Sequence, residues 1–166
     1  MRLMRRVTIE TPEMKQKDAF LKVRDEGDRI TLTYKQFKTL SVDGALEREV
    51  TLNDFDETIA LLAAVNLPYH SFQESKRETW HCDNVEIVID EWPWLNPYIE
   101  IEADGVMAVK DFAKKLDLNW NEAVFGDVMA AYRVQYPHLT ERDTVGDLPK
   151  VRFGDPLPDL LKAPKV

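Results

Sequence analysis

Charged and apolar side chains alternate along segment after segment of this chain, and this alternation constrains the fold most. Between residues 29 and 36, for example, the polar Thr33 and Lys35 alternate with apolar neighbours. A period of two is that of a β-strand, whose successive side chains point to opposite faces of a sheet. Strands with one polar and one apolar face are typical of antiparallel sheets. The pattern predicts seven strands, over residues 2–9, 19–24, 29–36, 46–52, 69–82, 85–92 and 97–103.

Three further segments predict helices, from their capping residues or an apolar stripe of helical period. The first begins at Asp54 and ends near Asn66, a short one lies near 106–116, and the last covers 123–132 after a cap at Asn119. An apolar helix stripe must be buried against something. Helices over the apolar faces of the strands would leave the charged faces inside, as in a barrel with a polar bore. The expected fold is α+β, mainly an antiparallel β-barrel with helices packed outside.

The segment 89–102 carries carboxylates at strand spacing. Glu100 and Glu102 share one face of a predicted strand, and Asp90 lies on the corresponding face of the strand before it. Acids on one face repel each other unless a cation lies between them, and hard divalent cations prefer carboxylate oxygens. These three residues are therefore candidate metal ligands. The alternative is that they form the solvated side of an antiparallel sheet.

Basic side chains follow the same alternation upstream. Lys22 and Arg24 share one face of a predicted strand, and Lys35 lies on the polar face of the next one. Arg77 and Glu49 occupy polar faces of two further strands. The predicted polar faces thus carry charges of both signs.

Composition bounds the class of protein. At 166 residues, we expect one domain over residues 1–138 and a proline-containing tail over 139–166. The net charge of −8 argues against a nucleic-acid partner, although a local basic face can still bind an anion because salt screens distant charges. Cys82 is the only cysteine, so no zinc spacing arises from cysteines. The sequence shows neither a signal peptide nor a long apolar run, which predicts a cytoplasmic protein without a membrane partner.

Six short segments occur in the same order and with similar spacing in the CYTH family, which the chain resembles. The resemblance covers roughly the first 115 residues. That family includes the class IV adenylate cyclases and the thiamine triphosphatases, within the triphosphate tunnel metalloenzymes. The segments are Leu21-Lys22-Val23-Arg24, Thr33-Tyr34-Lys35, Arg48-Glu49, Lys76-Arg77, Ile89-Asp90 and Glu100-Ile101-Glu102.

The chain departs from the family pattern at its beginning. The family opens with a strand that carries Glu-x-Glu-x-Lys, and residues 1–10 contain no such motif. The predicted strands are therefore one fewer than the eight of the family, and an open or incomplete barrel is expected. An exposed sheet edge can pair with another chain, so a homodimer is an expected partner state.

The resemblance implies a metal-dependent enzyme that hydrolyses a nucleotide, thiamine or inorganic triphosphate. Two alternatives remain: a class IV adenylate cyclase, which converts ATP to cyclic AMP and pyrophosphate, and a degenerate domain that binds polyphosphate without catalysis. The implied residues that bind the triphosphate and act in catalysis are Lys22, Arg24, Lys35 and Arg77. The implied ligands of Mg²⁺ or Mn²⁺ are Glu49, Asp90, Glu100 and Glu102.

Overall fold

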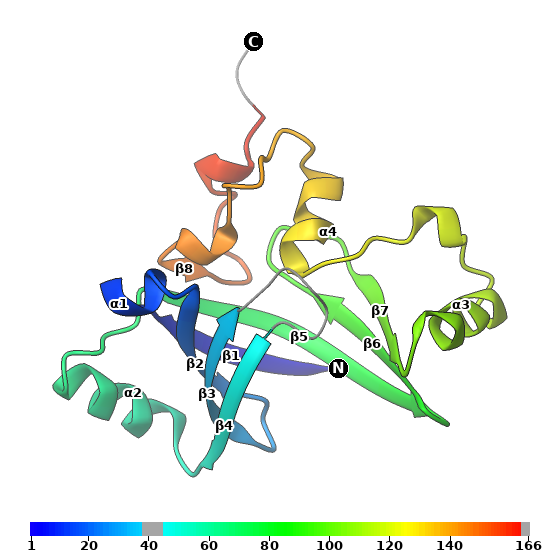
Figure 1. Ribbon diagram of the computed structural model, residues 1–166. Helices are drawn as coiled ribbons and strands as arrows, with labels where there is room; N and C mark the ends of the chain where they lie inside the picture. Colours follow the sequence, from blue (N-terminus) through cyan, green and yellow to red (C-terminus); the bar gives the residue numbers. More distant parts are fainter. Residues whose placement is uncertain (38–44, 164–166) are drawn as a thin grey trace. The chain divides into compact units, whose positions relative to one another are not determined.

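A computed structural model describes residues 1–37 and 45–163 as an α+β fold (Figure 1). All seven predicted strands are present, and a two-residue strand in the tail is added to them. The strands are β1 (Arg2–Ile9), β2 (Ala19–Asp25), β3 (Ile30–Phe37), β4 (Ala45–Leu52), β5 (Ser71–Cys82), β6 (Val85–Glu91), β7 (Tyr98–Ala103) and β8 (Lys150–Val151). The α-helices are α1 (Pro12–Lys15), α2 (Phe55–Ala64), α3 (Val106–Lys115) and α4 (Val128–Gln135). The 3-10 helices are η1 (Trp120–Glu122), η2 (Val145–Asp147) and η3 (Asp159–Leu161).

The strands form one sheet in the order β4-β3-β2-β1-β5-β6-β7, with β8 paired to β5. Neighbours in β1–β4 and in β5–β7 are antiparallel, whereas β8 runs parallel to β5. In the described part of the chain, the end strands β4 and β7 do not pair with each other, so the sheet is open. Of the expected forms, the open barrel type is thus confirmed. None of the described helices is long and apolar enough to cross a membrane.

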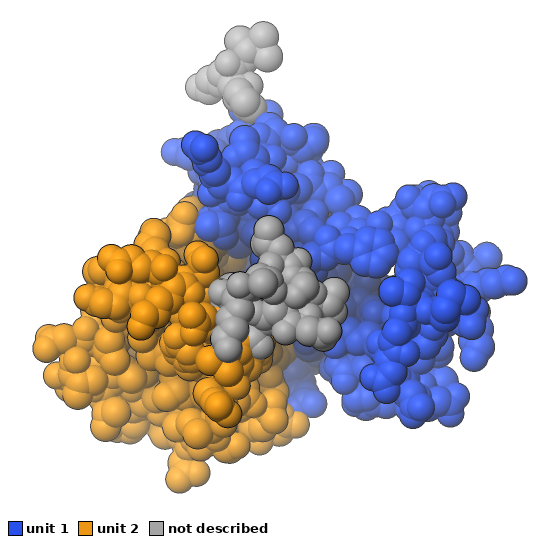
Figure 2. Space-filling view, in the orientation of Figure 1, with its two compact units in different colours: residues 1–2, 75–145, 153–166 blue, residues 3–74, 146–152 orange. Residues whose placement is uncertain are grey.

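The chain forms two compact units, which Figure 2 shows in different colours. Unit 2 contains residues 3–74 and 146–152, and unit 1 contains residues 1–2, 75–145 and 153–166. Strand β5 begins in unit 2 and ends in unit 1. The expected tail over 139–166 contributes to both units, with its last three residues outside the described ones. The predicted domain boundary itself stays a prediction.

Unit 2 is held together by apolar residues on one face of β1 and β2, which α2 covers. The helix begins where predicted, because the Asp54 side chain accepts a hydrogen bond from the Glu57 backbone N–H at 2.8 Å. Helix α2 therefore lies on the apolar face, opposite the charged side chains, as expected for this unit. The buried cluster consists of Val7, Ile9, Val23, Phe55 and Leu62.

The last helix of unit 1 begins later than predicted, so the expectation of a helix over 123–132 is wrong at its start. Asn119 caps only the three-residue η1. Helix α4 starts where the Asp127 side chain accepts from the Met129 backbone N–H at 3.0 Å. Gly126, just before it, has φ of +138°, a conformation that side-chain-bearing residues rarely adopt and that a helix over 123–132 could not contain.

Candidate functional site

The polar face of unit 2 brings basic side chains from three neighbouring strands together. In the antiparallel register, Lys22 on β2 pairs with Thr8 on β1, and Arg24 pairs with Arg6. Directly opposed residues have their side chains on the same face of a sheet. Lys35 lies two residues beyond the β3 partner of Lys22, so it shares this face too. We call this set the basic face: Arg6, Lys22, Arg24 and Lys35.

Lys22 is the residue of the basic face that lacks an ion-pair partner among the residues that the structure describes. Burial lowers the pKa of its ammonium to about 8, with further contributions from the positive charges of Arg24 and Arg6. A nearby like charge disfavours the charged form of a group. Positive charge is therefore in excess at Lys22, and an anion bound there would be stabilised.

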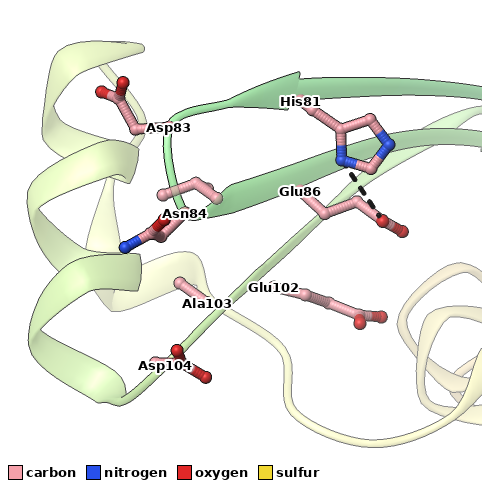
Figure 3. A pocket seen from close by; sticks show the side chains of 8 residues that line it. His81, Asp83, Asn84, Glu86, Glu102, Ala103 and Asp104 are labelled. Atoms are coloured by element: carbon pink, nitrogen blue, oxygen red, sulfur yellow. Dashed lines mark ion pairs between the residues drawn. The ribbon is translucent and has the colours of Figure 1, made fainter.

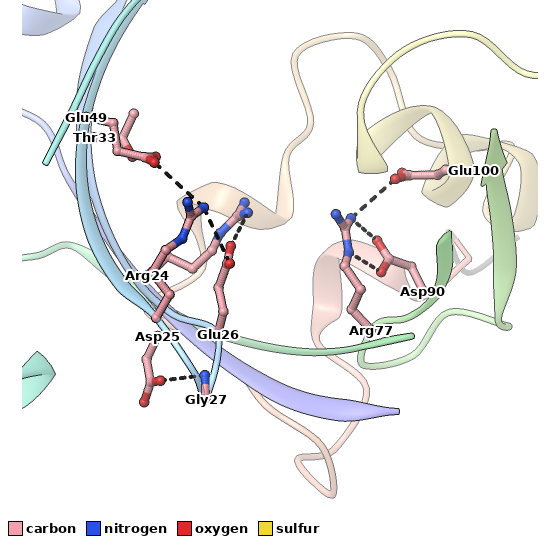
Figure 4. Close-up of polar contacts among 10 residues, drawn as sticks. Arg24, Asp25, Glu26, Gly27, Thr33, Glu49, Arg77, Asp90 and Glu100 are labelled. Carbon is pink, nitrogen blue, oxygen red and sulfur yellow. Dashed lines mark hydrogen bonds and ion pairs between the residues drawn. The ribbon is translucent and has the colours of Figure 1, made fainter. Parts of the chain in front are cut away.

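The other predicted cations of this face pair with carboxylates. Arg24 Nη1 lies 3.2 Å from Glu26 Oε1 (Figure 4), and Lys35 Nζ lies 2.7 Å from Glu47 Oε1. The hydrogen bond from Lys35 lowers the pKa of Glu47. Glu47 is 49% exposed, and ion pairs that water reaches contribute little stability. Such a pair can be exchanged for a ligand oxygen at small cost.

Arg6 belongs to the basic face, although the sequence prediction omits it. Its Nε donates to Gln73 Oε1 at 2.7 Å, which fixes the guanidinium on this face. The signal that finds it is the alternation of Arg6 and Thr8 with the buried Val7 and Ile9.

Glu49 also lies on the polar face of unit 2, whereas the other predicted metal ligands belong to unit 1. Its Oε2 accepts a hydrogen bond from Thr33 Oγ1 at 2.8 Å, and its Oε1 lies 3.7 Å from Arg29 Nη2 (Figure 4). The structure therefore groups Lys22, Arg24, Lys35 and Glu49 in one unit, and it groups the four remaining predicted residues in the other.

In unit 1, Arg77 on β5 binds two of the predicted carboxylates at once (Figure 4). Its Nε and Nη2 donate to the two oxygens of Asp90 at 2.7 and 2.5 Å. Nη2 also donates to Glu100 Oε2 at 3.2 Å. Asp90 is only 2% exposed, so its carboxylate depends on this arginine for its hydrogen bonds. Burial opposes the charge of Arg77, but the hydrogen bonds to Asp90 and the charges of Asp90 and Glu100 together outweigh burial and raise the arginine pKa.

Negative charge remains in excess around Glu100 despite Arg77. Burial raises the pKa of Glu100, and the charges of Asp90 and Glu102 raise it further. Tyr98, next to Glu100 on the same face, has a buried hydroxyl whose pKa is raised by burial and by Glu100. The negative charges of Asp90 and Glu102 beside Glu100 indicate that a further cation would be favourable here. We call Asp90, Glu100 and Glu102 the acidic face.

Glu102 lies at a shallow pocket of about 430 Å³ at the far end of the acidic face (Figure 3). Glu86 is its cross-strand partner, and His81 Nδ1 lies 3.6 Å from Glu86 Oε2. Asp83 and Asp104 also line this pocket. Glu102 therefore lies two residues from Glu100 on the same face of β7, but it does not bond to Arg77.

The turn between β6 and β7 holds Asp90 and Glu100 in place, and α4 fixes this turn. Tyr132 donates to the Pro93 carbonyl at 2.6 Å, and Gln135 Nε2 donates to the Trp94 carbonyl at 2.8 Å. The hydroxyl of Tyr136 donates to the same Trp94 oxygen. Several bonds to two consecutive carbonyls make the turn rigid, which orients the strand ends that carry the carboxylates.

Among the described residues, no three His, Cys, Asp or Glu side chains come close enough together to hold a metal ion, so a metal site here has at most two such ligands. Mg²⁺ usually takes one or two carboxylates together with substrate phosphates and water. Asp90 and Glu100 bond to the same Arg77 nitrogen and are hard oxygen donors in a region with excess negative charge. These two residues fit a divalent cation that binds jointly with phosphate oxygens.

The comparison with protein-family models matches residues 8–126 to the CYTH domain. The chain belongs to the CYTH domain family. This is a family of triphosphate tunnel enzymes, which generally depend on a metal ion. The match spans all eight predicted site residues of the CYTH chain and ends before α4, whereas Arg6 lies outside it.

Solved structures of low sequence identity share the fold of this CYTH chain. It is similar to a conserved hypothetical protein from Pyrococcus furiosus, with a TM-score of 0.57 and 16% identity over 73% of this chain and 77% of that chain. A protein from Pyrococcus horikoshii gives a TM-score of 0.57 and 18% identity over 73% and 76%. A "putative adenylate cyclase" from Bacillus halodurans gives 0.53 and 18% over 77% and 81%. The search of curated proteins gave no match.

Proposed function

We propose that the protein binds and processes a small molecule that carries a triphosphate chain. The observation that carries this proposal is Lys22, a partly buried ammonium beside Arg6 and Arg24, with no ion-pair partner among the described residues and a pKa lowered to about 8. A phosphate chain offers several charged oxygens, which can neutralise neighbouring cations together. Arginine can bind two such oxygens at once.

The cations of the basic face have distinct roles in this proposal. Lys22 binds phosphate oxygen without giving up a protein partner. Arg24 and Lys35 exchange the carboxylates of Glu26 and Glu47 for phosphate oxygens. Oriented cationic donors stabilise the negative charge that spreads over the phosphoryl oxygens in the transition state.

The carboxylates of unit 1 bind Mg²⁺ or Mn²⁺ in this proposal, with Asp90 and Glu100 as ligands and Glu102 adding negative charge nearby. A bound divalent cation neutralises charge on the phosphoryl group. Arg77, held by the same two carboxylates, supplies a further cationic donor. The metal role of Glu49 stays a prediction.

The proposed reaction is hydrolysis, in which water attacks the terminal phosphorus and the shortened phosphate chain leaves. The basic face, Arg77 and the metal would serve a cyclase equally, in which the ribose 3′-hydroxyl attacks the α-phosphorus. A domain that only binds polyphosphate would need the basic face alone. The products distinguish the three.

Binding is tested by the melting temperature with tripolyphosphate. A ligand that binds only the native state, at about 100 times its Kd, should stabilise it by about 2.7 kcal/mol. Lys22→Met should lose most of this shift. Lys17→Met, which removes an exposed lysine outside the basic face, should retain it. An equal shift in all three proteins would exclude the basic face as the binding surface.

Turnover is tested by incubating the whole chain with Mn²⁺ or Mg²⁺ and tripolyphosphate, ATP or thiamine triphosphate. We expect release of inorganic phosphate. Cyclic AMP and pyrophosphate would identify a cyclase, and a stabilising shift with no product would identify a binding domain.

A further inference from the structure

Arg77 uses both oxygens of the Asp90 carboxylate and one oxygen of Glu100 (Figure 4). A divalent cation bound by these two carboxylates must approach their oxygens to about 2.0–2.6 Å, and both oxygens of Asp90 already accept from Arg77. Arg77 therefore cannot keep all its hydrogen bonds to Asp90 while a cation binds the same carboxylate oxygens.

Arg77 is the only ion-pair partner that Asp90 has among the described residues. Asp90 is 2% exposed, so water cannot replace a lost partner. A buried carboxylate must keep a cationic or hydrogen-bonding partner, because an unpaired buried charge is strongly unfavourable. Arg77 can leave only when another cation takes its place.

Arg77 itself is 28% exposed and uses Nε and Nη2 in these contacts, which leaves Nη1 without a bond to the described residues. The guanidinium can therefore contact a ligand from the solvent side. A phosphate oxygen is a suitable new partner, since arginine binds phosphate through the same two-pronged geometry as carboxylate.

We propose that Arg77 occupies the place of the divalent cation in the resting protein, and that the cation and Arg77 compete for Asp90 and Glu100. This inference rests on the proposed function. When the cation takes the two carboxylates, Arg77 is released and turns to a phosphate oxygen of the ligand. Cation and phosphate then favour each other's binding, because each stabilises the state that the other requires.

The decisive experiment measures Mn²⁺ binding without any phosphate compound, from the free Mn²⁺ signal in electron paramagnetic resonance. Arg77→Met should bind Mn²⁺ roughly tenfold or more tightly than the wild type, a typical size for the coupling of two sites. Arg77→Lys keeps the charge but has no guanidinium group to hold both carboxylates. This variant should therefore also bind Mn²⁺ more tightly than the wild type. Lys76→Met removes a neighbouring charge that pairs with Glu91, and it should leave Mn²⁺ binding unchanged.

Mn²⁺ should also raise the melting temperature of Arg77→Met more than that of the wild type, because it replaces the lost partner of Asp90. If Arg77→Met does not fold, Arg77→Lys decides the question. Equal Mn²⁺ affinity in the wild type and Arg77→Lys would overturn the competition, since a gain limited to Arg77→Met would reflect charge alone. The proposed function fails separately, when tripolyphosphate does not stabilise the wild type.

Discussion

Lys22 in unit 2 and Glu100 in unit 1 are both partly buried beside a like charge, and their pKa values move in opposite directions. The pKa of Lys22 is lowered most by burial and next by the positive charge of Arg24. The pKa of Glu100 is raised most by burial and next by the negative charge of Asp90. In both cases the shift favours the neutral form. After burial, the largest contribution comes from a positive neighbour at Lys22 and from a negative neighbour at Glu100, so the local charge has opposite sign at the two residues.

This difference shows that local charge, rather than the net charge of −8, decides what each face can bind. The two faces also differ in how their ion pairs are buried. Lys35 pairs with Glu47, which is 49% exposed, whereas Arg77 pairs with Asp90, which is 2% exposed. The pair in unit 2 can open at small cost, and the pair in unit 1 requires a replacement cation.

The largest expected effect tests this difference in burial. Asp90→Asn should lower the free energy of unfolding by about 3 kcal/mol, because it removes the charge that compensates Arg77 in a buried pair. Glu47→Gln, which breaks an exposed pair, should change it by less than about 1 kcal/mol. Urea unfolding of both variants measures the two values.

Equal effects of Asp90→Asn and Glu47→Gln would contradict the comparison. An Asp90→Asn variant that loses no stability would mean that water already reaches Asp90 and that Arg77 is free to move. Circular dichroism on both variants confirms that the fold is retained.

The sequence predicts the fold well where the signal is local. Strand alternation is visible in a few residues, so all seven strands were found, while β8 is too short to show a period. The start of α4 was misplaced because Asn119 has the residue type of a cap but starts only η1. The backbone turns extended at Ala123, and Gly126 has φ of +138°, which a helix cannot contain; an isolated glycine in the sequence does not reveal its φ angle.

The candidate site was predictable in its residue types but not in its pairing. Strand spacing placed Lys22, Arg24 and Lys35 on one face, and the structure agrees. The partnership of Arg77 with Asp90 depends on the register between β5 and β6, which no local pattern encodes. The placement of Glu49 in the other unit likewise follows from chain topology rather than from spacing.

A second expected effect, of about 1–2 kcal/mol, tests the lowered pKa of the partly buried Lys22. Its pKa is about 8 in the folded protein, against 10.5 for an ordinary lysine side chain. Between these values the unfolded chain binds more protons, so wild-type stability rises with pH across this window. Below about 8 the charged lysine is present in both states and destabilises the folded one. Lys22→Met should therefore be more stable than the wild type at pH 7, with an advantage that shrinks towards pH 10.5.

Urea unfolding at pH 7 and pH 10 measures this dependence, with Lys17→Met as the matched control. The control should show the same difference from the wild type at both pH values. A constant difference for Lys22→Met as well would mean that the pKa of Lys22 is not lowered in the folded protein.

The smallest expected effect concerns a feature that the two units share, which makes it a check on the comparison. An exposed aspartate starts one helix in each unit, α2 and α4: Asp54 accepts from Glu57 N–H at 2.8 Å, and Asp127 accepts from Met129 N–H at 3.0 Å. Asp54→Ala and Asp127→Ala should each cost about 1 kcal/mol, because each leaves one N–H at the start of a helix without its acceptor. Asp54→Asn keeps an acceptor and should cost much less. If one alanine variant costs several times more than the other in urea unfolding, the units differ in their backbone stability as well as in the charge of their polar faces.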